Sequence, residues 1–258
     1  MMNDEVIKLI ENRRSIRSFE ERPLDPEVLD KLKRLTLRCP TGGRFSVIEI
    51  VDQSKKDKLC ALCENQVMIS RAPGVWLFLS DMERFYSWMK EKKCAENFGE
   101  SLDKPGIGTF HLGMQDAIIA AQNAVIASEA MGMHSCFVGD IIENYEEIQA
   151  MFNLPKYAVP ACLLIFGYAK TIPTSPLTSR PEPEYVFMKD GYKHQSVEEC
   201  EKMYEKNTAS FRERGVLPFD NTGSYIDWYY RKKYTSDWMA EMSRSVGVFL
   251  DRWLSDEA

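Results

Sequence analysis

The most constraining feature of the chain is a long stretch with no polar face, LGMQDAIIAAQNAVIASEAM at residues 112–131. Its apolar residues are spread around the whole circumference of the predicted helix rather than gathered on one stripe. Such a helix needs neighbours on every side, so the stretch predicts either a large core or a subunit interface. Gln122 and Asn123 interrupt it, and no apolar run in the chain reaches the roughly 18 residues of a membrane span.

The rest of the chain mixes helices and strands without a strict βαβ rhythm, which indicates an α+β or mixed α/β fold in one domain, residues 1–258. Residues 82–111 are irregular, aromatic and glycine-bearing, and long loops of this kind predict a mobile flap over a pocket. Residues 195–258 predict a C-terminal helical extension. Short apolar runs predict strands, and apolar residues at helical spacing predict helices. The strands are expected at 46–52, 74–81, 132–140 and 157–169, and the other helices at 4–13, 26–35, 54–70 and 144–155.

The overall charge excludes two classes of partner. With 39 acidic and 33 basic residues the net charge is −6, so neither nucleic acid nor an anionic membrane would attract the chain at long range. The N-terminal residues show no signal peptide, and we expect a cytoplasmic protein. Seven scattered cysteines fit reduced thiols. Cys60 and Cys63 form a C-x-x-C pair in a helical pattern without a second pair, and we interpret them as structural.

An acidic chain that gathers three arginines in RRSIRSF, residues 13–19, calls for an explanation. A solvated basic turn is one interpretation, and a nucleic-acid contact, disfavoured by the net charge, is another. The alternation places Ser15 and Arg17 on one side of an extended segment and Ile16 on the other. Guanidinium groups and a hydroxyl on one side suit a phosphate, which arginine binds through paired hydrogen bonds. A small phosphorylated ligand is the prediction from this motif.

No residue pattern points to chemistry carried by the protein itself. There is no Ser-His-Asp order, no metal-ligand cluster and no carboxylate pair at useful spacing, and we predict no metal site and no catalytic side chain. CPTGGRF, residues 39–45, has a threonine and two glycines after a helix, which suits either close approach of backbone amides to a ligand or an ordinary turn. If the chain is an enzyme, a cofactor supplies the reactivity.

Six stretches in order resemble the nitroreductase family of FMN-dependent oxidoreductases. ENRRSIRSFEERPLDPEVLDKL resembles the N-terminal signature of the family, and CPTGGRF stands where the family has its flavin loop. DAIIAAQNAVIASEAMGM is similar to the central helix, SCFVGD to the strand that meets the flavin ring, and VPACLLIFGYA to the strand after it. SRPE after GYA resembles the late arginine that returns to the phosphate. The resemblance covers nearly the whole chain.

The resemblance implies a set of residues that bind FMN. Arg13 and Ser15 would contact the phosphate, with Arg14 contributing through backbone and placement, and Arg17 would reach the pyrimidine edge. A cation at that edge stabilises the negative charge of the reduced ring. Asp140 stands where many members carry glycine, and position 43 is glycine where many carry a polar side chain. The other implied contacts are Thr41, Gly43, Gln66, Val138, Gly139, Asp140, Ser179 and Arg180.

The resemblance also implies a fold, a partner and a reaction. The fold is a sandwich with a mostly antiparallel sheet flanked by helices, completed as a domain-swapped homodimer with flavin at the interface. The reaction is ping-pong: NADPH or NADH delivers hydride to the flavin N5 and leaves, and a small aromatic acceptor such as a nitroaromatic, a quinone or free flavin then takes the electrons. The alternatives are a non-catalytic FMN protein for storage or sensing, and a dimer that binds another phosphorylated metabolite.

Overall fold

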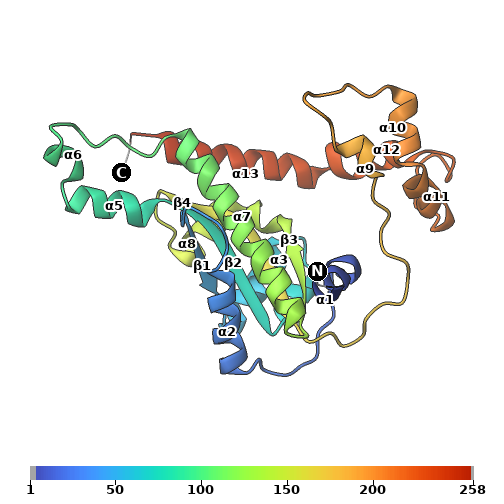
Figure 1. Ribbon diagram of the computed structural model, residues 1–258, viewed down its shortest axis with the longest axis horizontal. Coiled ribbons are helices and arrows are strands. Elements are labelled where there is room, and N and C mark those ends of the chain that lie inside the picture. The colour runs from blue at the N-terminus through green and yellow to red at the C-terminus, as the bar shows by residue number, and fades with distance from the viewer. Residues whose placement is uncertain (1–3, 257–258) are drawn as a thin grey trace. The chain divides into compact units, whose positions relative to one another are not determined.

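The computed structural model describes residues 4–256, which form two compact units (Figure 1). The first unit comprises residues 1–173 and 241–258, and the second comprises residues 174–240. The expectation of a single domain stays a prediction. The elements of the first unit are α1 (Asp4–Asn12), α2 (Pro26–Thr36), β1 (Phe45–Glu49), α3 (Gln53–Leu62), α4 (Val67–Arg71), β2 (Gly74–Asp81), α5 (Glu83–Glu91), α6 (Cys94–Asn97), α7 (Ile107–Ala130), β3 (His134–Val138), the 3-10 turn η1 (Gly139–Ile142), α8 (Tyr145–Phe152) and β4 (Ala158–Gly167).

The second unit is a small helical body with an aromatic centre. Its rings of Tyr204 and Tyr225 stack 5.1 Å apart, and Trp228 extends the stack with its centroid 5.9 Å from that of Tyr225. Its elements are α9 (Pro183–Val186), α10 (Val197–Met203), α11 (Glu205–Glu213), α12 (Tyr225–Tyr229) and the π-helical turn η2 (Tyr230–Tyr234), after which α13 (Asp237–Leu254) begins.

Within the described residues, four strands form an antiparallel sheet in the order β1-β2-β4-β3. Successive side chains of the two central strands point to opposite faces, as strand geometry requires. Leu77 of β2 and Leu163 of β4 lie on one face, and Trp76 and Phe166 lie on the other, where their ring centroids are 4.8 Å apart. The mostly antiparallel sheet expected from the sequence is confirmed.

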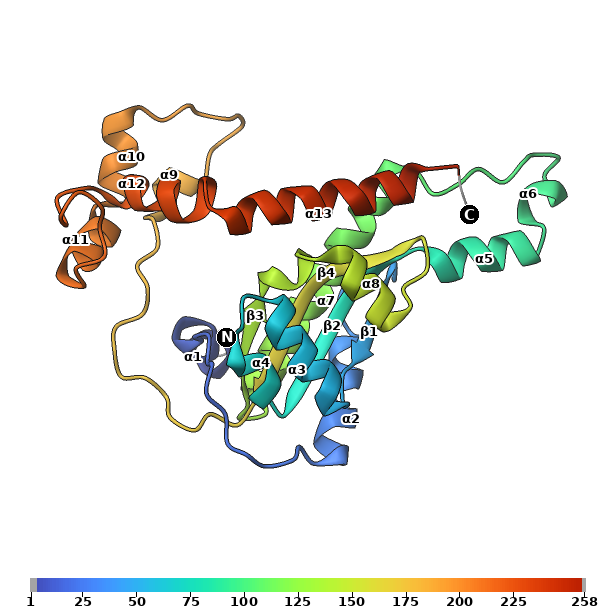
Figure 2. The ribbon, with the colours of Figure 1, turned by 180° about the vertical axis from the view of Figure 1, so that it is seen from behind.

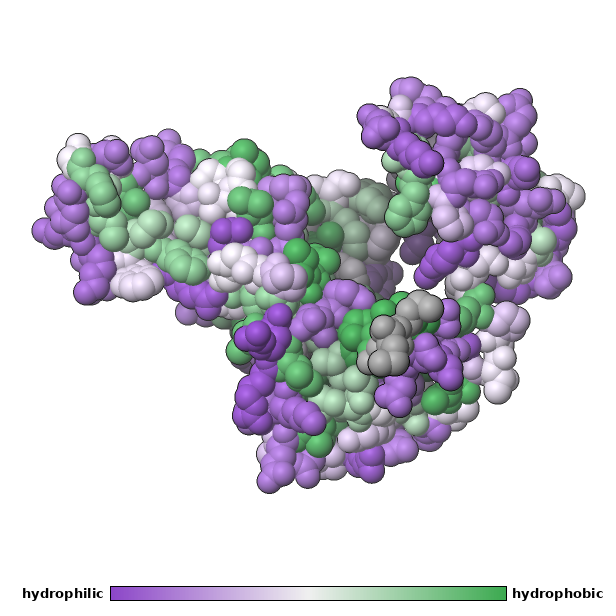
Figure 3. All heavy atoms as spheres, viewed as in Figure 1, coloured by the Kyte–Doolittle hydropathy of each residue, from purple (hydrophilic) through white to green (hydrophobic). Residues whose placement is uncertain are grey.

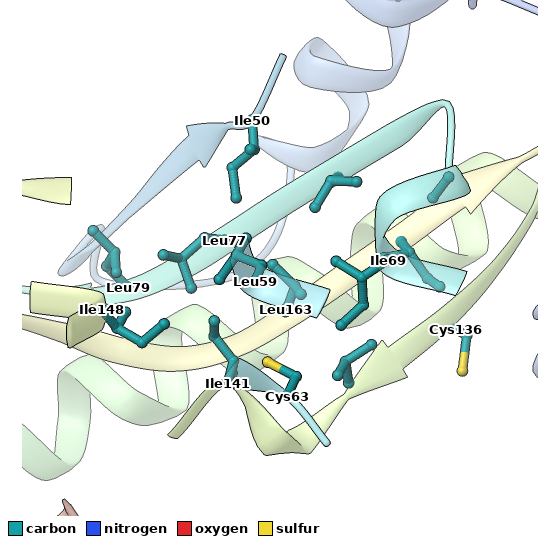
Figure 4. Packing of buried hydrophobic residues seen from close by; sticks show 14 of the residues in the cluster. Ile50, Leu59, Cys63, Ile69, Leu77, Leu79, Cys136, Ile141, Ile148 and Leu163 are labelled. Atoms are coloured by element: carbon teal, nitrogen blue, oxygen red, sulfur yellow. The ribbon is translucent and has the colours of Figure 1, made fainter. Parts of the chain in front are cut away.

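Helices cover both faces of this sheet. The helices α3, α4 and α8 pack on the face of Leu77 and Leu163 (Figure 2), and their fully buried side chains include Leu59, Ile69 and Ile148 (Figure 4). The helices α2 and α7 cover the opposite face. The structure is therefore the expected α+β sandwich, with a core on each side of the sheet.

The central helix α7 is buried on one face only within the chain. Ala117, Ala120, Ala121 and Ala124 are all 0 % exposed, because small side chains let the helix lie close to the sheet. On the other side Leu112, Ile118 and Ile119 are 45, 44 and 39 % exposed, and Figure 3 shows hydrophobic side chains on the face over which α7 runs. The core accounts for only part of the burial expected from the sequence, and the subunit interface stays a prediction.

Two predicted boundaries were wrong. Residues 82–111 contain the helices α5 and α6, and α7 begins at Ile107 rather than at residue 112. The helix predicted at 54–70 is two helices, because Glu64 and Asn65 adopt positive φ angles of 55° and 54° and break the hydrogen-bond ladder. This break shapes the turn in front of Gln66, which caps α4.

Candidate functional site

The basic segment leaves α1 and runs extended along the edge of the sheet. The amide of Ile16 donates to the carbonyl of Ser135 in β3 over 3.0 Å. Ile16 is 2 % exposed and Phe19 is 7 % exposed, so both anchor the segment in the core, while Ser15 and Arg17 are exposed. The predicted alternation is confirmed, and its physical cause is the pairing with β3.

Three of the predicted site residues surround the start of β3. The side chains of Ser15 and Arg17 hydrogen-bond the Cys136 thiol. Burial raises the pKa of Cys136, and the charges of Arg17 and Arg13 work in the opposite direction. Burial likewise raises the pKa of Glu129 at the end of α7, against the charges of its neighbours His134 and Arg13. Arg13 and Arg17 therefore lie close to Glu129 and Cys136, at the edge of the sheet formed by β3.

Arg14 differs from the other two arginines. Its guanidinium donates to the backbone carbonyl of Pro173 and so ties the segment to the chain that follows β4. The side chain is half-buried. The role of Arg14 in placing the phosphate-binding segment stays a prediction.

The residues expected to face a flavin lie at the other end of β3. Val138 is 1 % exposed and ends the strand, Gly139 is exposed, and Asp140 is half-buried at the start of η1. A Cβ atom on Gly139 would meet nothing within 4 Å, so its backbone is open to an approaching ligand. From Cys136 to Gly139 the strand advances by roughly 10 Å. The cations of the basic segment and the open backbone of Gly139 are thus separated by three residues along β3 and the start of η1.

Gln66 is half-buried and lies next to the basic segment. The two residues after it, Val67 and Met68, line a cavity of about 220 Å³ together with Arg17. Arg71, Lys170 and Glu21 line the same cavity, so its three cations outnumber its one carboxylate. The structure therefore brings the turn before α4 to the side of the arginine segment, as the predicted site requires.

Thr41 and Gly43 are not brought to this place within one chain. They line a cavity of about 670 Å³ beside α2 and β1. Gly43 has φ of 80°, which favours glycine. The buried carboxylate of Asp116 in α7 accepts from the amide of Arg44 over 3.0 Å and fixes the loop. Because β1 and β3 form opposite edges of the sheet, the loop and the basic segment lie on different sides of the chain.

Ser179 and Arg180 belong to the second unit. They line a cavity of about 470 Å³ whose walls include the stacked rings of Tyr225 and Trp228, with Lys233 at its margin. Their predicted contact with a phosphate stays a prediction.

The sequence analysis missed one residue of the neighbourhood, Glu143. It follows η1, is only 3 % exposed, and its Oε1 has no hydrogen-bond partner among residues 4–256. The pKa of Glu143 is raised to about 8. The causes are burial, the neighbouring charges of Asp140 and Glu64, and a hydrogen bond to Asp140. The only sequence signal is the spacing of three residues between the two carboxyl groups, because the burial comes from distant parts of the chain.

Other chemistries find little support. In the described part of the chain, no group of three or more His, Cys, Asp and Glu residues is placed to hold a metal ion. Cys63 is fully buried, and burial raises the pKa of both its thiol and that of Cys60, which makes them poor nucleophiles. None of the helices in residues 4–256 is long and apolar enough to cross a membrane.

Comparison with known proteins gives consistent results. The family model described as the Nitroreductase family matches residues 10–168. The chain is 29 % identical over 230 residues to the FMN reductase (NADPH) of Bacillus subtilis, covering 88 % of this chain and 84 % of the relative. It is 24 % identical over 256 residues to an NADPH-dependent oxidoreductase of Staphylococcus epidermidis, covering 95 % and 98 %.

Solved structures share the fold at lower identity. Nitroreductase A from Vibrio parahaemolyticus superposes with a TM-score of 0.83 at 18 % identity over 100 % of both chains. The NADPH:FMN oxidoreductase from Vibrio harveyi complexed with NAD⁺ gives 0.78 at 16 % identity, covering 95 % of this chain and 97 % of the other.

Proposed function

The chain belongs to the nitroreductase family, and from this premise we propose that it is an FMN-dependent NAD(P)H oxidoreductase. One observation carries the proposal: the basic segment packs against Ser135 and Cys136 of β3, and the open backbone of Gly139 directly follows this strand. The same strand thus offers a place for a phosphate and a place for a flat ring, about 10 Å apart.

The residues present fit FMN. Arg13 and Ser15 bind the phosphate, since guanidinium and hydroxyl groups are suited to its oxygens. Arg17 is exposed and lines the basic cavity beside Gln66, so both are placed to bind the polar edge of a flavin. A fixed cation there stabilises negative charge that develops during reduction. FMN supplies the hydride chemistry when bound, and the chain supplies position and electrostatics.

A homodimer completes the site. Thr41 and Gly43 sit at the opposite edge of the sheet from the basic segment, so only a second copy places them at the same flavin. The exposed apolar face of α7, including Ile118 and Ile119, is the surface that such a partner covers.

The reaction is two-step transfer through one pocket. NADPH or NADH binds first, donates a hydride and leaves, and a small aromatic acceptor then takes its place. Nitroaromatics, quinones and free flavins are the acceptor class, because a pocket beside open backbone recognises a flat ring more than particular substituents.

Anaerobic double mixing tests the proposal. The purified protein with FMN is mixed with NADPH or NADH, and the visible absorption of oxidised flavin is followed; menadione is then added. We expect the bands to bleach and to return. A protein that binds FMN but never bleaches with either nucleotide is a storage or sensing protein, and one that takes up no FMN contradicts the proposal outright.

A further inference from the structure

A buried carboxyl group lies directly behind the end of β3. The amide of Glu143 donates to the carbonyl of Asp140 over 3.0 Å and closes the η1 turn, so the two side chains belong to one rigid turn. Asp140 is half-buried, while Glu143 is 3 % exposed. The Oε1 atom of Glu143 is enclosed and finds no hydrogen-bond partner within residues 4–256. A buried oxygen without a partner calls for a reason other than stability.

The charges around Glu143 are almost all negative. The η1 turn contributes Asp140, and the turn after α3 contributes Glu64 and the buried thiol of Cys63. From α13 comes Glu241, which accepts from the amide of Asn144 and pairs with Arg244. No cation pairs directly with Glu143 in residues 4–256.

Burial and these carboxylates raise the pKa of Glu143 to about 8, so the group carries a proton at neutral pH. A carboxyl group that holds its proton under working conditions is suited to general acid catalysis. Its hydrogen bond to Asp140 leads toward the backbone that the proposed function places at the flavin.

We propose that the Asp140–Glu143 pair supplies the proton that the acceptor needs in the second half of the reaction. Asp140 is the catalytic residue in this proposal, because it is half-exposed and directly follows Gly139, and Glu143 is a positioning residue that holds the proton behind it. The inference rests on the proposed function, which places the backbone of Gly139 at the flavin ring.

The step balances for a quinone. The quinone gains a hydride, which carries two electrons and one proton, from the reduced cofactor site. One O–H bond of the carboxyl pair breaks and one forms on the quinone oxygen, giving a hydroquinone. Water returns a proton to the pair through the half-exposed Asp140. The first half of the reaction delivers hydride only, so it needs no proton from the pair.

Glu143→Gln tests the inference, because glutamine keeps the shape and cannot release a proton. Reduced wild-type and variant proteins are mixed anaerobically with menadione, which needs a proton, or with ferricyanide, which takes only electrons. We expect reoxidation by menadione to be about a hundredfold slower in Glu143→Gln. Reoxidation by ferricyanide, reduction by NADPH and FMN affinity stay within about twofold. Equal slowing with both acceptors, or no slowing with menadione, overturns the inference.

The pH dependence separates proton supply from packing. The wild-type rate with menadione falls above about pH 8, and that of Glu143→Gln is flat through the same range. Asp140→Asn provides a second variant. We expect it to slow reoxidation of the reduced protein by menadione and to leave reoxidation by ferricyanide unchanged. Glu147→Gln is the matched control, because Glu147 is exposed on α8 and pairs with Lys58 at the surface.

A readout without the cofactor keeps the two proposals apart. Infrared difference spectra of the protein free of FMN, recorded below and above about pH 8, are expected to show loss of a protonated carboxyl band that Glu143→Gln lacks. A wild type that shows this band but does not bleach with either NADPH or NADH refutes the proposed function and, with it, the role of the pair. A wild type that turns over but lacks the band refutes the proton store alone.

Discussion

Glu143→Gln is expected to stabilise the protein in a way that grows with pH. In the unfolded chain Glu143 has the ordinary pKa of 4.5, and in the folded protein its pKa is about 8. Below pH 4.5 both states are protonated and the group causes no difference. Between the two values the unfolded state loses a proton that the folded state keeps, so the contribution of the group to stability falls as pH rises from 4.5 to about 8 and is constant above that.

The magnitude follows from the two pKa values. Each pH unit between them lowers the free energy of unfolding by about 1.4 kcal/mol. At pH 7 the penalty reaches up to about 3 kcal/mol for a fully buried group, and water penetration reduces it, so we expect about 2 kcal/mol. Glutamine cannot ionise, and the variant therefore gains this amount at pH 7 and almost nothing near pH 4.5.

Urea unfolding of the FMN-free protein at several pH values measures the effect. The difference between variant and wild type should rise from near zero at pH 4.5 to about 2 kcal/mol at pH 7, and level off above about pH 8. Glu147→Gln removes an exposed ion pair with Lys58 and should change the free energy of unfolding by about 0.5 kcal/mol or less at every pH. A difference for Glu143→Gln that is constant with pH refutes the assignment of a proton to this group.

Three further predictions concern the helix α7 and the 42–44 loop that it holds. Asp116→Ala leaves two backbone amides of the 42–44 loop without an acceptor, and we expect a loss of about 2 kcal/mol in urea unfolding. Gly113→Ala places a Cβ 2.3 Å from the buried Ser80 Oγ and should lower stability by about 1–3 kcal/mol, whereas Gly108→Ala in the same helix meets nothing within 4 Å and should not. Ile118→Glu charges the exposed face of α7, and sedimentation velocity should show a dimer converted to monomers, with a lower melting temperature because association no longer stabilises the folded state; a monomeric wild type contradicts the homodimer.

Many helices and strands could be predicted from the sequence, because the patterns that determine them lie within a few neighbouring residues. The sequence Asp25-Pro26 predicts a helix start, and in the structure the Asp25 side chain accepts a hydrogen bond from the Glu27 amide at the beginning of α2. The run GVWLFLSD forms β2 with every residue buried, and the alternation in the arginine segment held because Ile16 pairs with β3.

The remainder depends on contacts between distant residues. The start of α7 was missed because glycine, threonine and histidine weaken the helical pattern of residues 107–111. Glu143 looks like an ordinary surface glutamate in the sequence, and its raised pKa depends on burial and on the charges of Glu64 and Glu241, which come from distant parts of the sequence. The separation of Thr41 from the arginines follows from the strand order, which no local pattern encodes.

The central claim is that the basic segment of an acidic chain binds the phosphate of FMN. Comparing the dissociation constants of FMN and riboflavin by fluorescence titration tests it most directly, because riboflavin lacks only the phosphate. Two charge-assisted contacts predict that FMN binds about 100-fold tighter or more. Arg13→Ala should reduce that ratio about tenfold, and Arg38→Ala, at an exposed position after α2, should preserve it. Equal affinity for the two flavins in the wild type would contradict the account.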